Sequence, residues 1–236
     1  PHQTPNFCRD LTEYDAELDA AMARIRQRDG HRIVVLSGHS TGGLVGPLWA
    51  DARRRQGART VDAVVLNSPW LDLQGSLLLR TAGTQAIDRI GLRRPYQIVP
   101  RNVSALYCES LHRDFRGEWD FDLAWKPRTS FPVRAGWLRA VRRGHRQVHR
   151  GIDVGAPVLV LCSRRSTTPQ EWCDDVTCTD VVLDVRQIAR WSHNLGTHVT
   201  ISRVDGAVHD VLASPPRVRK TAYGEISRWL SAYLAD

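Results

Sequence analysis

The residues with the most recognisable chemistry are the letters GHSTG at positions 38–42, which place Ser40 in the middle of a glycine-flanked turn. They directly follow an apolar run, IVVL at residues 33–36, and precede a helix-like segment. A serine at such a junction sits on a sharp, strained turn that exposes its hydroxyl, and the flanking glycines let strand and helix pass close together. Ser40 is therefore a candidate nucleophile, and the backbone N–H of Thr41 is a candidate donor to an oxyanion. The alternative is a serine that caps a helix in a glycine-rich turn.

A serine nucleophile needs a neighbouring base, and His209 is the best placed of the nine histidines. It follows the predicted strand at residues 199–204 by a few positions, in a loop that contains a glycine. In serine triads on chains of alternating strands and helices, the histidine follows the last strand in this way. His39 lies inside the serine turn, where we expect its side chain to point away from the nucleophile. For His198, which opens a strand, we expect a structural role.

The acid that orients the histidine should follow the buried strand predicted at residues 157–162. Four carboxylates lie in that part of the chain: Asp174, Asp175, Asp180 and Asp184. Asp180 is favoured, because it stands just before the next predicted helix. Asp184 is equally explained as the N-cap of that helix, and Asp174 and Asp175 stay open as alternatives.

These residues need a rigid frame, and the apolar pattern predicts one of alternating helices and strands. Asp10 with Glu13 has the spacing of a capping box at the start of the first helix. The first and third strands are continuous apolar runs and the second is apolar apart from Asp62, a pattern typical of strands buried on both faces, whereas the last strand is more polar and is expected nearer an edge. The order predicts an α/β fold, with a mostly parallel sheet covered by helices on both faces. We expect helices at residues 10–29, 42–56, 184–195 and 216–235, and strands at residues 33–36, 61–66, 157–162 and 199–204.

The predicted rhythm breaks at residues 73–152, which show no clear strand and hold eight aromatic side chains. A segment of this length between two strands must fold as a layer of its own. We interpret it as a cap or lid over a pocket, with a packing subdomain as the alternative. The chain then divides into residues 1–72 with the serine turn, the cap at 73–152, and residues 153–236 with the acid and the histidine.

The composition and charge limit which binding partners are expected for this chain. The net charge of +8 comes from 33 basic against 25 acidic residues, nearly all of the basic ones Arg and without a nucleic-acid-binding motif, so we expect no nucleic-acid partner. No apolar run approaches the ~20 residues of a membrane span, and no signal peptide is visible. Five cysteines without a CxxC pair favour a reducing, cytoplasmic location and argue against a disulfide framework or a metal site. We expect no cofactor, and nothing indicates the oligomeric state.

The motifs together resemble the α/β-hydrolase family, in particular its lysophospholipase and monoacylglycerol-lipase-like branch of the serine aminopeptidase type. The matching pieces are GHSTGG at residues 38–43, NSPWLD at 67–72, the cap-sized insert, Asp180 in a D-x-x-x-D setting, and GAVH at 206–209. The resemblance implies Ser40 as nucleophile, His209 as base and Asp180 as orienting acid.

One departure from the family is large. The family places three to four strands, a helix and a His-Gly turn before the nucleophile strand, whereas this chain has one helix and one strand there. The expected consequence is a fold that lacks its N-terminal strands and the second oxyanion donor. The leading hypothesis is a carboxylic-ester hydrolase that forms an acyl-enzyme with a small-molecule ester or lipid-like substrate. The alternative is a catalytically inactive remnant or interaction protein, and an acyltransferase or peptidase would use the same residues.

Overall fold

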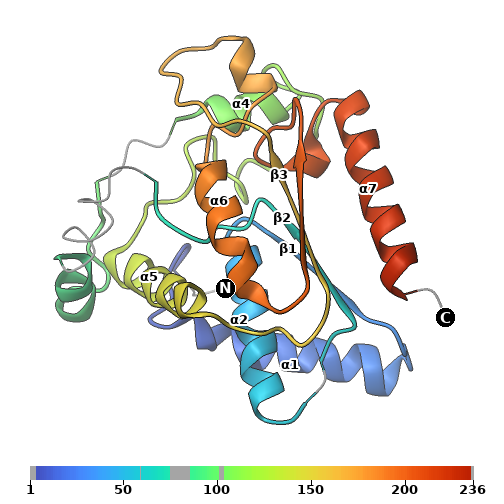
Figure 1. Ribbon diagram of the computed structural model, residues 1–236. Coiled ribbons are helices and arrows are strands. Elements are labelled where there is room, and N and C mark those ends of the chain that lie inside the picture. Colours follow the sequence, from blue (N-terminus) through green and yellow to red (C-terminus); the bar gives the residue numbers. More distant parts are fainter. Residues whose placement is uncertain (1–3, 59, 75–85, 101–103, 235–236) are drawn as a thin grey trace.

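A computed structural model of the chain describes residues 4–58, 60–74, 86–100 and 104–234. Its centre is a four-stranded parallel sheet in the order β1-β2-β3-β4 (Figure 1). The strands are β1 (Val35–His39), β2 (Ala63–Asn67), β3 (Val158–Ser163) and β4 (Val199–Val204). Since the spatial order equals the chain order, each connection carries the chain one strand further across the sheet.

Helices cover both faces of this sheet, as the sequence pattern predicts (Figure 1). Successive residues of β2 point to opposite faces: Val64 and Leu66 join one buried core, and Ala63 and Val65 join the other. The larger core includes side chains of α2, α5 and α6, and the smaller includes side chains of α7. The bounds are η1 (Leu11–Tyr14), α1 (Asp15–Ala23), η2 (Arg24–Arg28), α2 (Gly42–Arg55), α4 (Leu106–Leu111), α5 (Ala135–Arg150), η3 (Asp174–Thr177), α6 (Val185–Ser192), η4 (His193–Leu195), η5 (Val211–Ala213) and α7 (Pro216–Leu234).

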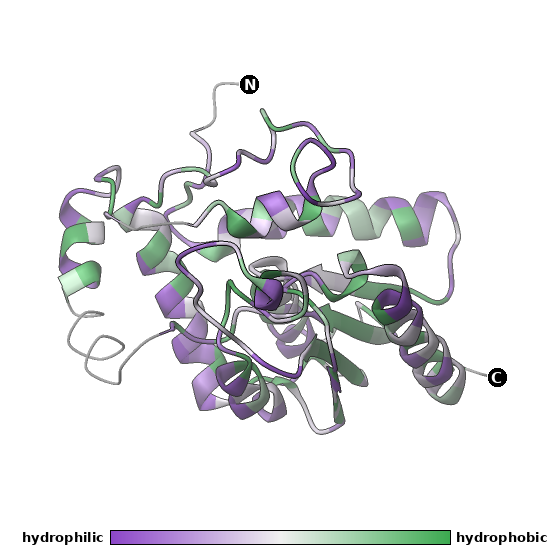
Figure 2. Ribbon diagram, turned by 90° about the horizontal axis from the view of Figure 1, so that it is seen from above, coloured by the Kyte–Doolittle hydropathy of each residue, from purple (hydrophilic) through white to green (hydrophobic). Residues whose placement is uncertain are grey.

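The predicted elements all appear, with one error about burial. β2 and β3 are buried throughout, which explains their unbroken apolar runs, and Figure 2 shows the strands of the sheet as predominantly hydrophobic. The prediction that the first strand is buried on both faces was wrong. It begins at Val35, which is 36% exposed, and Ile33 before it is 50% exposed. The reason is that β1, like β4, is an edge strand of the sheet in the described residues.

The first predicted helix is divided into three short pieces, η1, α1 and η2. The capping box is present: the Asp10 carboxylate accepts from the Thr12 backbone N–H at 3.1 Å, and Glu13 accepts from the Asp10 N–H at 3.1 Å. None of the described helices combines the length and apolar character that crossing a membrane requires.

One part of the predicted cap region consists of short helices and irregular chain, and another part packs on the main core. Residues 86–93 and α4 are helical, residues 112–134 are mostly irregular, and no strand longer than an isolated bridge occurs in its described residues. Its last helix, α5, packs on the main core through Trp137, Leu138 and Val141. The division of the chain at residues 73 and 152, and the role of the insert as a cap, stay predictions.

Candidate active site

Ser40 occupies a tight turn between β1 and α2. Its φ of +52° lies in the left-handed region that residues other than glycine rarely adopt. Three backbone hydrogen bonds hold it there. The Ser40 N–H donates to the carbonyl of Asn67 at 3.0 Å, and its own carbonyl accepts from Gly43 at 3.0 Å and from Trp70 at 2.9 Å. The surrounding backbone thus fixes a strained residue at the carboxyl end of the sheet.

Two glycines permit the close crossing of strand and helix at this turn. A Cβ on Gly38 would lie 2.8 Å from the carbonyl oxygen of Gly42, and a Cβ on Gly43 would lie 2.6 Å from Cβ of Pro69. Gly42 has nothing within 4 Å of its Cβ position. The sequence interpretation assigned the close approach to the two glycines of GHSTG, and the structure corrects the second of them to Gly43.

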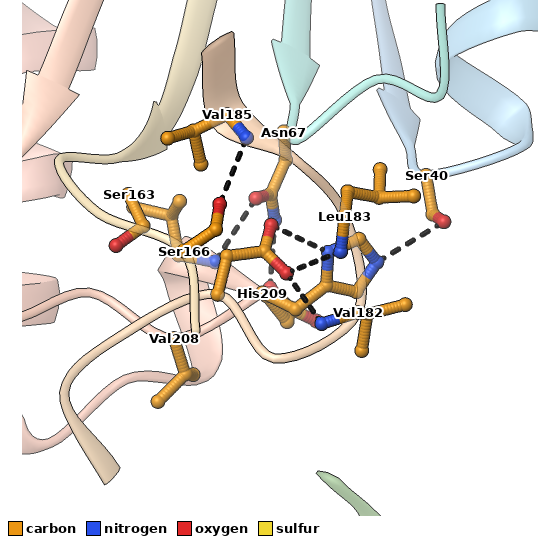
Figure 3. A network of polar contacts seen from close by, with 12 residues as sticks. Ser40, Asn67, Ser163, Ser166, Val182, Leu183, Val185, Val208 and His209 are labelled. Atoms are coloured by element: carbon orange, nitrogen blue, oxygen red, sulfur yellow. Dashed lines mark hydrogen bonds and ion pairs between the residues drawn. The ribbon is translucent and has the colours of Figure 1, made fainter. Parts of the chain in front are cut away.

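The structure brings Ser40, His209 and Asp180 into one hydrogen-bonded series (Figure 3). Nε2 of His209 lies 3.1 Å from Oγ of Ser40, and Nδ1 of His209 lies 3.0 Å from Oδ2 of Asp180. The other carboxylate oxygen, Oδ1, accepts from the backbone N–H groups of Val182 and Leu183, each at 2.8 Å. Asp180 is fully buried and His209 nearly so. With both carboxylate oxygens acting as acceptors, Nδ1 carries the proton and Nε2 is left to accept from the serine hydroxyl.

The other three acid candidates lie elsewhere. Asp184 caps α6, because its carboxylate accepts from the N–H of Arg186 at 3.0 Å. Asp174 and Asp175 lie in η3, and Asp175 faces Arg165 at 3.5 Å. Among the four, the structure places Asp180 alone against the histidine.

Asn67 at the end of β2 connects the sheet to the histidine loop, a role that the sequence analysis missed. Its Nδ2 donates to Oδ1 of Asp210 at 2.6 Å, and its Oδ1 accepts from the N–H of Val211 at 3.0 Å (Figure 3). Asp210 and Val211 directly follow His209, so these bonds fix the loop that carries the imidazole. The available signal was an amide residue at the carboxyl end of a buried strand.

His39 does not point away from the nucleophile as the sequence analysis expected. Its ring centre lies 4.9 Å from that of His209, and it lines the same cavity as Ser40. Burial lowers the pKa of His39 to about 4, and the neighbouring His209 acts in the same direction. His39 is therefore neutral at pH 7 and adds no positive charge beside the candidate base. The expectation failed because the tight turn rotates residues on both sides of Ser40 toward the cavity.

Ser40 opens into a cavity of about 930 Å³, which is of the size that holds small organic ligands. Thr41, at the start of α2, and the candidate base also line it, so that nucleophile, base and candidate oxyanion donor face one space. Trp70 and Trp137 form an aromatic wall, with ring centres 5.6 Å apart. In the part of the chain that the structure describes, no group of three or more His, Cys, Asp or Glu side chains is arranged to hold a metal ion.

No protein-family model matches the sequence, and the comparison with curated proteins found no match either. The structure is similar to the monoacylglycerol lipase of Paleococcus ferrophilus, with a TM-score of 0.65 and 19% identity over 95% of this chain and 76% of that one. It is also similar to a soluble variant of monoglyceride lipase from Saccharomyces cerevisiae, with a TM-score of 0.62 and 10% identity over 94% and 69% of the two chains. Est1E from Butyrivibrio proteoclasticus gives a TM-score of 0.55 and 14% identity over 96% and 72%.

At these identities the likeness shows the fold. The parallel sheet, the strained serine turn between β1 and α2, and the lipases among the similar structures agree with one another. The chain therefore has the α/β-hydrolase fold predicted from its sequence.

Proposed function

We propose that this chain is a serine hydrolase of carboxylic esters, with Ser40 as nucleophile, His209 as base and Asp180 as the acid that orients the base. The observation that carries the proposal is the hydrogen-bonded series from Ser40 Oγ through His209 to Asp180, at the wall of a ligand-sized cavity. Nucleophile and base within hydrogen-bond reach, with the base oriented by a third group, are the geometric signature of covalent catalysis.

The proposed reaction has two halves. As Oγ of Ser40 attacks the acyl carbonyl, Nε2 of His209 takes its proton, and Asp180 stabilises the imidazolium that forms. The carbonyl oxygen gains charge, which the N–H of Thr41 stabilises at the start of α2. The imidazolium then protonates the departing alcohol and leaves an acyl-enzyme. Water, deprotonated by His209, attacks the acyl carbon, releases the carboxylic acid and restores the serine hydroxyl.

The cavity supports an apolar, lipid-like portion of the substrate. Its wall includes Trp70, Leu106, Phe131, Val133 and Trp137, and apolar lining of this kind binds acyl chains by removing them from water. Two of the similar structures are lipases of monoglycerides by name, which supports a lysophospholipase- or monoacylglycerol-lipase-like role in lipid metabolism.

A catalytically inactive chain is the second candidate, and one observation favours it. Thr41 is the one oxyanion donor that we assign among the described residues. A site with one donor in place of two is slower by about 10²–10³-fold, so this observation predicts slow turnover rather than none.

A fluorophosphonate probe, which reacts with activated serines, separates these candidates. We expect the purified chain to be labelled and Ser40→Ala to abolish the labelling. Ser130→Ala is the matched control, because Ser130 lines the same cavity and also has a left-handed backbone, with φ of +64°, and its labelling should equal that of the wild type. Labelling that survives Ser40→Ala would refute the assignment of the nucleophile, and a chain that is never labelled would favour the inactive candidate.

A further inference from the structure

Lys126 is one of only two lysines in this Arg-rich chain, and it lines the same cavity as Ser40. A turn fixes its backbone. The N–H groups of Trp125 and Lys126 donate to the carbonyl of Asp122 at 3.1 and 3.0 Å, and the Asp122 carboxylate accepts from the N–H of Ala124 at 2.7 Å. The turn therefore fixes the backbone from which the ammonium group extends.

The charge of Lys126 is not neutralised by an ion pair with any carboxylate in the described residues. Its Nζ lies instead over two aromatic rings, 5.0 Å from the ring centres of Tyr107 and Phe121. Arg128, which lines the same cavity, shows the contrast, since its Nε donates to Oε1 of Glu109 at 2.7 Å. The cavity wall thus carries one compensated and one uncompensated cation.

The carboxylate that acts on Lys126 most strongly is that of Asp210, and it is already engaged. Its Oδ1 accepts from Asn67 at 2.6 Å and from the Leu212 N–H at 3.1 Å. Burial lowers the pKa of Lys126, and Asp210 opposes this at a distance. The Lys126 side chain is exposed and lines the cavity, so its ammonium group is accessible to an anionic group of a ligand that enters there.

Tyr107 supplies a second unsatisfied group at the same place. It lines the cavity, and its buried hydroxyl has no hydrogen-bond partner among the described residues. Its ring stands edge-on to His209, with ring centres 5.3 Å apart. The distance from Nζ of Lys126 to the centre of the His209 ring therefore cannot exceed the sum of the two distances to the Tyr107 ring centre, 5.0 Å and 5.3 Å.

From these contacts we infer that Lys126 and Tyr107 form a subsite for a carboxylate group on the ester substrate. One ammonium and one hydroxyl match a singly charged anion better than a phosphate dianion. The distance limit keeps the ammonium group near enough to the candidate base for one short dicarboxylic acyl chain to reach both. The preferred substrates are then half-esters of dicarboxylic acids with an apolar spacer, an inference that rests on the proposed ester hydrolysis.

Matched substrates test the subsite. Monoethyl adipate and ethyl hexanoate have the same six-carbon acyl chain and differ in a terminal carboxylate or methyl group. We expect kcat/KM to be at least tenfold higher for the adipate, measured by acid release at constant pH. Butyrylglycerol and its 3-phosphate form a second pair. A stronger preference for the phosphate than for the adipate would overturn the choice of a carboxylate.

Variants separate an anion subsite from a structural role. Lys126→Gln should lower kcat/KM at least tenfold more for the adipate than for the hexanoate, and Lys126→Arg should restore part of the difference. Lys220→Gln is the control, since it removes the only other lysine, from the exposed surface of α7, and should change neither value. Equal losses on both esters in Lys126→Gln would show that the lysine only stabilises the insert and would overturn the inference.

Binding to Ser40→Ala keeps the test independent of turnover. By calorimetry, this variant should bind monoethyl adipate at least tenfold more tightly than ethyl hexanoate, and Lys126→Gln in the same background should remove the difference. Equal binding of the two esters overturns the subsite even if hydrolysis occurs. Wild-type protein that binds the adipate preferentially but hydrolyses no ester contradicts the proposed function and supports the subsite.

Discussion

Asp180→Asn tests the proposed triad sharply, because it removes one charge and keeps the shape of the side chain. The carboxylate serves three donors: His209 at 3.0 Å, and the backbone N–H groups of Val182 and Leu183 at 2.8 Å each. An asparagine has one acceptor oxygen and one NH₂ group in place of two acceptor oxygens. Its oxygen should face the two backbone donors and its NH₂ the histidine, because the reverse orientation sets donors against donors.

The size of the effect follows from this orientation. The new NH₂ donates to Nδ1 of His209, so the imidazole proton moves to Nε2, the atom 3.1 Å from the Ser40 hydroxyl. A protonated Nε2 cannot accept the serine proton. The same change in a serine-protease triad lowers kcat by about 10⁴, which corresponds to roughly 5 kcal/mol of activation free energy. We expect a loss of this order in kcat, with KM changed little because the cavity wall is intact.

The assay is steady-state hydrolysis of a short-chain 4-nitrophenyl ester, together with the rate of fluorophosphonate labelling. Asp184→Asn is the control, because an asparagine caps a helix as well as an aspartate does, and kcat should stay within about twofold. Thermal unfolding of both variants should show folded protein. If Asp180→Asn retains more than a tenth of the wild-type kcat, or if Asp184→Asn loses as much, the reasoning about the acid is wrong.

Two further predictions concern folding. Gly38→Ala should lower the free energy of unfolding by about 1–3 kcal/mol, because its Cβ would lie 2.8 Å from a backbone oxygen. Gly42→Ala is the control and should change this free energy little, because the space at its Cβ position is open. Chemical denaturation measures both variants, and equal losses would contradict the close crossing of strand and helix. Burial lowers the pKa of His39 to about 4 and that of His145 to about 3, each from 6.5, with His209 and Arg142 respectively acting in the same direction. The unfolded chain then binds more protons below pH 6.5, so stability is lost as the pH falls, by about 3 kcal/mol for both histidines between pH 7.5 and 5.5. Urea unfolding at the two pH values checks this, and an unchanged free energy would show that these histidines are not buried neutral.

The fold could be predicted because its signals are local. The buried runs of β2 and β3 and the glycines around Ser40 report burial and backbone shape directly in the residue types. What failed was the burial of β1, since a strand's neighbours in the sheet are not written in its own residues. The same IVVL run fits an interior strand or an edge strand.

In the candidate site, too, some residues could be predicted from the sequence and others could not. His209 and Asp180 could be chosen because triads keep a fixed order along α/β chains, and the distance between them agrees with that choice. Asn67 had only the signal of an amide at the end of a buried strand, and the roles of Tyr107 and Lys126 could not be found, because each acts through contacts that the sequence does not show. Tyr107 and Lys126 lie in the insert, where no periodic pattern constrains the chain.

The segment that begins at the last residue of β2 shows how such contacts gather at one place. That residue, Asn67, holds the histidine loop, and Pro69 fills the space that Gly43 leaves open. The Trp70 N–H then donates to the carbonyl of Ser40 at 2.9 Å, while its ring forms part of the cavity wall. Residues 67–70 thus have three functions: they hold the loop of the candidate base, support the serine turn and line the pocket.

The same segment also fixes the insert to the sheet. Asp72 accepts from Nη1 of Arg142 on α5 at 2.7 Å, and both side chains are buried. Burial raises the pKa of Asp72, but the hydrogen bonds from Arg142 and the Leu73 N–H outweigh this and lower it. His145, neutral by its lowered pKa, faces the same arginine at Nδ1 and the Trp70 carbonyl at Nε2. A buried ion pair of this kind adds little net stability but permits one arrangement of its partners. Its position next to Trp70 means that one short stretch of chain, residues 67–72, contacts both the insert and the nucleophile turn.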